Sequence, residues 1–255
     1  MTAPIRLTVA SLETQSPSLR RLQGDTQPAC ELKLLLSEEQ ALAVEDRCRL
    51  ELLLDPHCTN QSSPGYHIKS LYCDTPEWDV FHRRNRFRLF KFRVRQYGSS
   101  TQVYLERKSK KGIEVRKKRW CIPLQQLGLL NGDAEQDWEG SWFHNQLIRN
   151  RLGPVCLIEY ERVAYYGSSG SEPVRLTFDR HIRGGLHHPW SMTSQTFSMP
   201  ILRNQVVCEF KFRGLLPPLF KSIIHELQLT TSGVSKYRHC IDASGVLKQE
   251  QKNYA

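Results

Sequence analysis

The sequence predicts an α+β fold in which antiparallel strands, grouped between helices, close into a barrel with a charged interior. The first observation is a stretch from 87 to 120 that reads as three strands with alternating cationic and apolar residues. Successive side chains of a strand point to opposite faces, so Lys91, Arg93 and Arg95 share one face. The second observation is that short turns join these strands, which favours antiparallel pairing over a wound parallel sheet. A closed sheet has no exposed edge, and a wide lumen can be polar.

The positive charge of the chain is concentrated in this stretch. From Arg83 to Arg119 there are 15 lysines and arginines against two acidic residues, whereas the whole chain has a net charge of only +10. Cations gathered beside low-dielectric walls focus a positive potential onto a polyanion. The charge distribution therefore predicts an anionic ligand.

Length and composition indicate one globular domain. The 255 residues are 39% hydrophobic and 24% charged, which is typical of soluble proteins. Residues 1–27, rich in Ser, Thr, Gln and Pro, predict a disordered lead-in, and residues 28–248 form the domain. No apolar run reaches the roughly 18 residues of a membrane span, and no signal peptide is recognised. The eight scattered cysteines predict reduced thiols and a cytoplasmic location, with any membrane-protein or homo-oligomer partner left open.

The first part of the domain reads as a strand, a helix and a second strand. Residues 29–36 form the first strand, and Ser37 is a typical helix N-cap because acidic residues follow it. The helix is expected to run to about residue 54. Its expected apolar face consists of Leu42, Leu50, Leu53 and Leu54. A strand follows over 66–73, and Pro76 suits the first position of a short helix ending at His82.

The remaining elements alternate hairpins with helices. The three basic strands are expected over 87–95, 103–108 and 113–120. Turn residues at 98–100 and 110–112 join them. A broken helix over 124–150 follows, then strands over 154–166, 174–180 and 206–213, an irregular segment over 184–199, and a helix over 217–229.

Alternation assigns an inward face to each strand. The expected inward residues are Glu31, Lys33, Arg93, Arg95, Glu106, Lys108, Lys117, Arg119, Tyr160, Arg162, Arg175, Thr177, Asp179, Glu209 and Lys211. So many cations cannot share a dry core, because burying an unpaired charge costs several kcal/mol per ion. A chain of phosphates would satisfy them, since arginine forks match phosphate oxygens and lysines supply point charge. The few carboxylates could hold Mg²⁺ or Mn²⁺, which usually bridge to substrate phosphates.

Eight short motifs follow one another between Cys30 and Arg238. They are Ser70-Leu71-Tyr72-Cys73-Asp74-Thr75, Lys91-Phe92-Arg93-Val94-Arg95-Gln96-Tyr97, Leu105-Glu106-Arg107-Lys108, Lys117-Lys118-Arg119-Trp120, Tyr160-Glu161-Arg162, Val174-Arg175-Leu176-Thr177-Phe178-Asp179, Cys208-Glu209-Phe210-Lys211 and Ser235-Lys236-Tyr237. In this order they resemble the VTC domain, the catalytic domain of polyphosphate polymerases in the triphosphate tunnel metalloenzyme (CYTH-like) superfamily. The resemblance implies an eight-stranded antiparallel β-barrel with flanking helices, a tunnel that binds nucleotide triphosphate and polyphosphate.

The resemblance also implies roles for single residues. It assigns phosphate binding to Lys33, Arg93, Arg95, Lys108, Lys117, Arg162 and Lys236, and metal binding to Glu209. Five of these are the expected catalytic residues: Arg93, Arg95, Lys108, Lys117 and Arg162. Further substrate-binding candidates are Arg119, Tyr160, Arg175, Lys211 and Ser235. Glu31 and Glu106 are further candidates for Mn²⁺ or Mg²⁺, with an internal salt bridge as the alternative for each.

Two positions depart from the family pattern. The hydrolytic branch of the superfamily begins with Glu-x-Glu-x-Lys, but here Ala29 replaces the first glutamate before Glu31 and Lys33. Some polymerase members carry a lysine where this chain has Gly233. The missing carboxylate favours transfer, because a terminal phosphate is already anionic whereas water must be deprotonated.

The expected function is therefore a polyphosphate polymerase that transfers the γ-phosphate of ATP to a growing chain. ATP and polyphosphate are the expected partners, rather than nucleic acid. A triphosphatase of the same fold is the alternative enzyme. A non-catalytic module that binds polyphosphate or nucleic acid through the same charge is the alternative outside catalysis.

Overall fold

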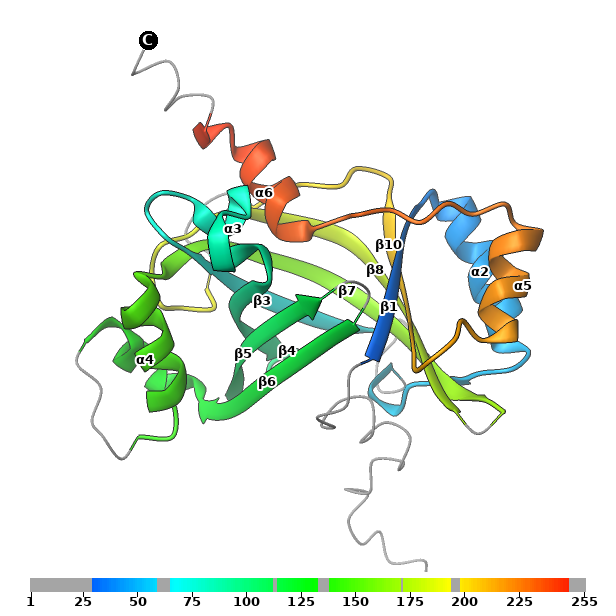
Figure 1. The fold of residues 1–255 in the computed structure, drawn as a ribbon, viewed down its shortest axis with the longest axis horizontal. Helices are drawn as coiled ribbons and strands as arrows, with labels where there is room; N and C mark the ends of the chain where they lie inside the picture. Colours follow the sequence, from blue (N-terminus) through cyan, green and yellow to red (C-terminus); the bar gives the residue numbers. More distant parts are fainter. Residues whose placement is uncertain are drawn as a thin grey trace, which may run out of the picture.

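Eight strands form a closed antiparallel ring in the part of the chain that the computed structural model describes, residues 29–58, 65–111, 114–132, 138–170, 172–193 and 198–247 (Figure 1). The ring strands are β1 (Ala29–Leu36), β3 (Tyr66–Asp74), β4 (Phe90–Tyr97), β5 (Gln102–Lys111), β6 (Glu114–Pro123), β7 (Gly153–Ser169), β8 (Glu172–Leu186) and β10 (Val206–Phe212). Their order is β7-β3-β4-β5-β6-β1-β10-β8, and β8 pairs back with β7. The predicted α+β class and eight-stranded barrel are confirmed.

Two short strands extend the ring, and one strand pairing within the ring is short. Strands β2 (Leu53–Leu54) and β9 (Met199–Pro200) pair with β7 and β8. Between β1 and β6 the described pairing covers only Ala29 with Val115 and Cys30 with Glu114. Farther along, β1 is hydrogen-bonded instead to the segment that precedes α6 (Lys236–Ser244). There, Ser232 donates its amide to the Lys33 carbonyl at 2.7 Å.

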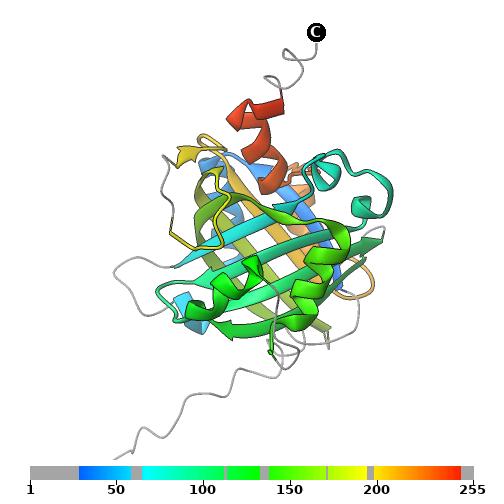
Figure 2. The ribbon, with the colours of Figure 1, turned by 90° about the vertical axis from the view of Figure 1, so that its left-hand side faces the viewer.

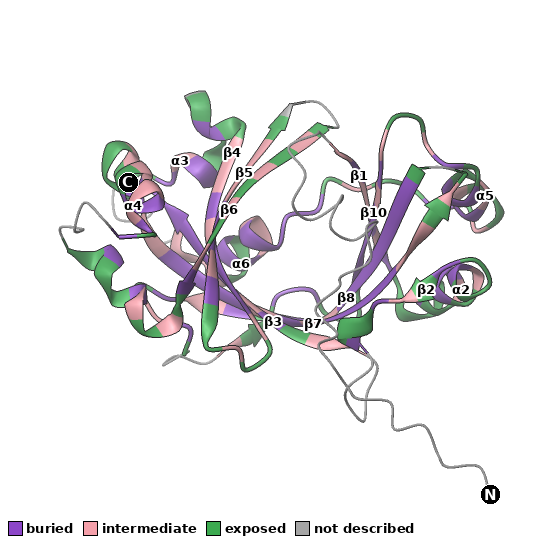
Figure 3. Cartoon of the chain, turned by 90° about the horizontal axis from the view of Figure 1, so that it is seen from below, coloured by how far each residue is buried: buried purple, intermediate pink, exposed green. Residues whose placement is uncertain are grey.

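One side of the ring is covered by α2 (Glu38–Arg49) and α5 (Pro218–Glu226), which pack outside β1, β8 and β10 (Figures 1 and 3). Ser37 caps α2 as predicted, in a capping box with Gln40. The helix buries Ala41, Val44, Glu45 and Cys48, which follow the spacing of one helical face.

The expected leucine face of this helix is wrong. Leu42 and Leu50 are exposed, the helix ends at Arg49, and Leu53–Leu54 form β2. Position on the helix decides burial here, since Ala41, Val44 and Cys48 lie at i, i+3 and i+7 and the leucines do not.

The other side of the ring is covered by α3 (Asp79–His82), α4 (Ser141–Asn150), α6 and the 3₁₀ turns η2 (Asn85–Arg88) and η3 (Leu124–Asn131). A further 3₁₀ turn, η1 (Pro56–Cys58), follows β2. Several elements differ from the expected bounds. Strand β4 begins at Phe90 because η2 precedes it, and α3 begins at Asp79 rather than Pro76. The expected helix over 124–150 divides into η3 and α4, and β8 runs on to Leu186.

The start of α3 has a local cause. The Asp74 carboxylate accepts hydrogen bonds from the backbone amides of Thr75, Val80 and Phe81. Thr75 Oγ1 accepts from the Asp79 amide at 3.1 Å. These contacts hold residues 75–78 in a turn, so the helix begins only at Asp79.

The strands of the two walls run across each other, and apolar cores lie outside the ring beneath the helices (Figure 2). All eight cysteines are free thiols and seven are buried, as predicted. None of the described helices is long and apolar enough to cross a bilayer. The predicted lead-in, 1–27, lies outside the described residues.

Candidate functional site

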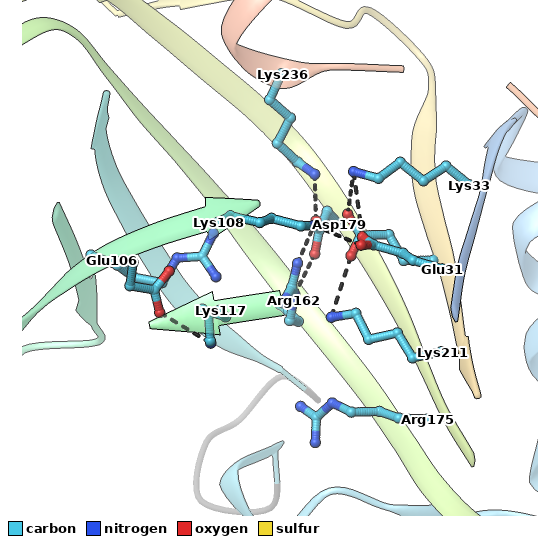
Figure 4. A network of polar contacts seen from close by, with 12 residues as sticks. Glu31, Lys33, Glu106, Lys108, Lys117, Arg162, Arg175, Asp179, Lys211 and Lys236 are labelled. Atoms are coloured by element: carbon cyan, nitrogen blue, oxygen red, sulfur yellow. Dashed lines mark hydrogen bonds and ion pairs between the residues drawn. The ribbon is translucent and has the colours of Figure 1, made fainter. Parts of the chain in front are cut away.

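The inner surface of the ring is cationic. Among the described residues it carries Lys33, Lys91, Arg93, Arg95, Lys108, Lys117, Arg119, Arg162, Arg175, Lys211 and Lys236. Most of these cations form ion pairs with five carboxylates: Glu31, Asp55, Glu106, Asp179 and Glu209. Figure 4 shows labelled side chains from both walls converging on the same space. The inner surface therefore keeps an excess of positive charge even after every carboxylate is paired.

Glu106 on β5 is the node of one wall. It lies directly opposite Arg93 on β4 and Arg119 on β6, because the three strands are in register there. Its carboxylate is 2.7 Å from each of these guanidinium groups and 3.2 Å from Lys117 Nζ. Burial alone would raise the pKa of Glu106, but Lys117 and the arginines outweigh it and hold that pKa well below its usual value. Both oxygens of Glu106 are thus occupied by cations.

Glu31 on β1 and Glu209 on β10 form a second node on the opposite wall. Lys33 Nζ is 2.8 Å from Glu209 Oε1 and 3.6 Å from Glu31 Oε1, so it bridges the two carboxylates. Lys108 Nζ contacts Glu31 Oε2 at 2.6 Å, and Lys211 Nζ contacts Glu209 Oε2 at 3.4 Å. Although burial opposes ionisation, Lys108 and Lys33 lower the pKa of Glu31 to about 2, so the pair is ionised at neutral pH.

Asp179 on β8 ties α6 to the ring. Arg162 grips it with two hydrogen bonds of 2.6 and 2.7 Å, and Lys236 Nζ lies 2.6 Å from the same carboxylate. Tyr237, the next residue, donates its hydroxyl to buried Asp74. The Ser-Lys-Tyr motif thus fixes the N-terminus of α6 at one end of the tunnel.

Tyrosines hold the remaining arginines. Arg95 donates to Tyr160 Oη at 2.9 Å and to Ser70 Oγ at 3.2 Å. Arg175 Nη1 is 2.6 Å from Asp55 Oδ2, and its other nitrogen donates to Tyr66 Oη at 3.2 Å. A cavity of about 380 Å³ lies among these groups, lined by Arg95, Arg162 and Arg175 and by Tyr66, Tyr97 and Tyr104 at its aromatic end.

Several inner lysines have a pKa below the usual value for lysine. Burial lowers the pKa of Lys117 and of Lys211 to about 8, although Glu106 and Glu209 oppose the shift. Burial and the neighbouring Lys33 and Lys108 lower the pKa of Lys91 to about 7. An anion bound beside such a lysine raises its pKa and binds most strongly to the protonated form.

The structure brings together all the residues that the sequence nominated for the site. Arg93, Arg95, Lys108, Lys117, Arg119, Arg162, Arg175, Lys211 and Glu31 line the cavity, and Lys33, Glu106, Glu209, Tyr160, Lys236 and Ser235 contact those residues or their partners. Their chemical roles remain predictions. Glu106 as a metal ligand is the one role that the contacts disfavour, because three cations already surround it.

Four contributors were given no role in the site from the sequence. Alternation had placed Lys91 and Asp179 on the inner face without assigning either a role. Tyr97 continues the row of Arg93 and Arg95 on β4, so the same alternation could have found it. Asp55 follows β2 outside any ring strand, so no local pattern signals its contact with Arg175.

The chemistry of Glu31 and Glu209 fits a divalent cation. Among the described residues, Glu31 Oε1 is buried without a hydrogen-bond partner, and Lys33 Nζ lies 3.6 Å from it. Mg²⁺ is commonly held by one or two carboxylates together with substrate phosphates and water. No group of three or more metal-ligating side chains occurs in the described part of the chain, so this wall would hold a metal only together with phosphate.

Comparison with known proteins gives one family match. The VTC domain matches residues 29–244. A proposed adenylyl cyclase from Hippeastrum, reported with a dominant triphosphatase activity, is 13% identical, with a TM-score of 0.48 over 86% of this chain and 97% of its own. A proposed adenylate cyclase from Bacillus halodurans is 11% identical, with a TM-score of 0.47 over 81% and 92%. No curated protein matches the chain.

Proposed function

The chain belongs to the VTC domain family of the triphosphate tunnel superfamily, and from this premise we propose that it is a polyphosphate polymerase. It transfers the γ-phosphate of ATP to the end of a polyphosphate chain. Members of the superfamily handle phosphate substrates and typically use divalent metals. The reaction, the substrates and the roles of single residues are our proposal.

The excess of cations around one cavity carries the proposal. Eleven lysines and arginines face five carboxylates inside the ring, and the cavity among them measures about 380 Å³. Phosphate oxygens satisfy such groups, because each guanidinium can donate two parallel hydrogen bonds and each ammonium supplies a point charge. A linear polyanion is therefore the ligand class that matches the tunnel.

The choice of transfer over hydrolysis is supported by what lines the cavity at β1. Ala29 and Glu31 both line it, so the position before Glu31 on the inner face carries a methyl group. Hydrolysis needs a group that positions and deprotonates water. A terminal phosphate is already anionic at neutral pH, so its attack requires alignment and charge neutralisation instead.

Residues of both walls would align the reacting phosphates. Arg93, Lys117 and Arg119 surround Glu106 and can turn their free N–H groups toward the phosphates. Glu31 and Glu209 would hold Mn²⁺ or Mg²⁺ from the opposite wall. A bound metal would neutralise charge on the transferring phosphoryl group. Arg162, fixed by Asp179, keeps its orientation without rearrangement during the transfer.

Product analysis tests this proposal. Purified protein is incubated with ATP and Mn²⁺, with a short polyphosphate as primer, and chain length is followed on a gel while ADP and free phosphate are measured. We expect chains to lengthen and ADP to exceed free phosphate. Free phosphate equal to ADP, without longer chains, would instead establish a triphosphatase.

Charge reversal at Glu209, a proposed metal ligand, distinguishes an enzyme from a binding module. Glu209→Lys is compared with Glu114→Lys, since Glu114 is exposed at the start of β6. If the protein is an enzyme, Glu209→Lys loses turnover and Glu114→Lys keeps it. A binding module would retain polyphosphate as well as before or better in both, and that result would refute the polymerase proposal.

A further inference from the structure

Strand β6 has an open edge along most of its length. Its pairing with β1 covers only Glu114 and Val115, and no other strand in the described part of the chain pairs with residues 116–123 on that side. Figure 1 shows β1 and β6 meeting at one end and then running apart. The backbone N–H and C=O groups along this edge can therefore pair with an added strand.

The two faces of this edge carry cations in different situations. Lys117 and Arg119 point into the tunnel, where both contact Glu106. Arg116 and Lys118 alternate with them and are exposed on the outer face. No described carboxylate forms an ion pair with either of these two. The outer face therefore has positive charge that only an acidic partner would neutralise.

Two further features belong to this outer face. Arg107 lies directly opposite Lys118 on the neighbouring strand, and both cations rest against the Trp142 ring, at 5.5 and 3.9 Å from its centre. Trp120, the next outward residue of β6, is 46% exposed. Cations that only protect an edge from pairing need no exposed tryptophan beside them, whereas tryptophan and arginine are typical anchors of protein interfaces.

We propose that the β6 edge is a docking site for an extended acidic segment of a partner protein, which adds as an antiparallel strand in line with β1. The segment places acidic side chains beside Arg116 and Lys118 and an apolar side chain beside Trp120. Its other face is uncharged, because Lys117 and Arg119 are already paired within the ring. Main-chain hydrogen bonds supply affinity, and the alternating side chains supply specificity.

The open backbone distinguishes an extended peptide from other polyanions. Charge alone would attract nucleic acid or polyphosphate, but only another polypeptide strand can pair with the N–H and C=O groups along the edge. The chain's own residues 1–28 precede β1, but they carry three arginines against two acidic residues, so they do not complement the edge. The docking site is independent of the reaction that takes place in the tunnel.

Fluorescence anisotropy with a labelled synthetic peptide tests the docking site on the full chain. The probe has eight residues, in which threonine alternates with valine, leucine, glutamate and glutamate in chain order. Paired antiparallel with residues 116–123, it sets the leucine beside Trp120 and the glutamates beside Lys118 and Arg116. A matched peptide with a methyl group on every backbone nitrogen keeps the charge but cannot pair with a strand edge.

The expected results separate strand pairing, charge and the aromatic contact. The probe binds, and the N-methyl peptide binds at least about 100-fold more weakly. Arg116→Glu and Trp120→Thr each lower the affinity for the probe about tenfold. Lys221→Glu makes the same charge change as Arg116→Glu on the exposed side of α5 and leaves the affinity unchanged. The thermal unfolding midpoint of each variant shows that it is folded.

Amide hydrogen exchange of the full chain adds a measurement that does not depend on the affinity of the probe. The β6 amides that point away from β5 should exchange rapidly in the free protein, and saturating probe should slow them. Slow exchange without the probe would show that the chain covers its own edge, and would overturn the proposal. Absence of probe binding, equal binding of the two peptides, or an affinity that neither Arg116→Glu nor Trp120→Thr changes would overturn it as well.

Discussion

The two walls of the tunnel both carry cations but use carboxylates differently. On the wall of β4, β5 and β6, Glu106 is surrounded by Arg93, Lys117 and Arg119. On the wall of β1, β8 and β10, three strands each contribute one carboxylate: Glu31, Asp179 and Glu209. Glu31 and Glu209 share Lys33, and Lys108 and Lys211 each contact one of them. One oxygen of Glu31 has no hydrogen-bond partner among the described residues.

This difference assigns a separate task to each wall. A carboxylate that three cations saturate has no oxygen left for a metal, so Glu106 orders the cations that face phosphate. The pair of Glu31 and Glu209 keeps one carboxylate oxygen, Glu31 Oε1, without a hydrogen bond, so it can accept a divalent ion when phosphates supply the remaining ligands. We therefore expect the β4–β6 wall to control phosphate binding and the β1–β10 wall to control the metal.

The largest expected effect comes from neutralising Glu106. Glu106→Gln leaves three cations crowded around a buried amide, so the free energy of unfolding should fall by about 3–5 kcal/mol. Urea denaturation measures it, with Glu114→Gln as the exposed control. Tripolyphosphate at 100 times its Kd should restore about 2.7 kcal/mol. A loss below about 1 kcal/mol would show that Glu106 does not organise this wall.

Neutralising Glu209 should affect turnover rather than phosphate binding. We expect Glu209→Gln to lower phosphoryl transfer roughly 100-fold, because a metal ligand is lost. Metal-free tripolyphosphate should bind at least as tightly as before, since Lys33 and Lys211 lose their carboxylate partner. Weaker metal-free binding in this variant would mean that Glu209 positions the cations instead.

Removing a single cation from the β4–β6 wall should weaken phosphate binding moderately. Lys117→Gln is expected to raise the Kd for tripolyphosphate about tenfold, which corresponds to the loss of one charge-assisted hydrogen bond. Lys118→Gln is the matched control, because that side chain lies outside the ring against Trp142. Equal effects of the two substitutions would place the binding surface outside the tunnel.

The smallest expected effect is a change of affinity with pH. Burial lowers the pKa of Lys117 to about 8 in the free protein, and bound phosphate raises it. Lys117 is therefore charged before binding below pH 8 and must gain a proton above it. Affinity for tripolyphosphate should fall roughly fourfold between pH 7 and pH 8.5, and less in Lys117→Arg. Affinity that increased with pH would contradict this assignment.

Local sequence patterns predicted the strands and their inner faces because alternation depends only on neighbouring residues. The rows on β4, β5 and β6 follow directly from it. The helix α2 shows the limit of such reasoning. Its cap was correctly predicted from Ser37. Its buried face was predicted from the most hydrophobic residues, the leucines, which are exposed, whereas Ala41 and Val44 lie where the helix approaches the sheet.

Partner choice within the site could not be predicted because it depends on ring closure. Lys33 and Glu209 are 176 positions apart, and the β1–β10 register places them opposite each other. The sequence left a salt bridge or a metal open for Glu106, and only the β4–β5–β6 register shows three cations around it. Asp55 reaches Arg175 from outside the ring strands, where no period applies.

The assignment of phosphate binding to the β4–β6 wall and of metal binding to the β1–β10 wall is tested most directly by a Mn²⁺ titration. Free Mn²⁺ is followed by electron paramagnetic resonance. The protein is titrated alone and saturated with a non-hydrolysable ATP analogue. We predict tight Mn²⁺ binding only with the analogue present, loss of that binding in Glu209→Gln, and its retention in Lys117→Gln once the analogue is saturating. Mn²⁺ binding that survives Glu209→Gln and disappears in Glu106→Gln would contradict the account.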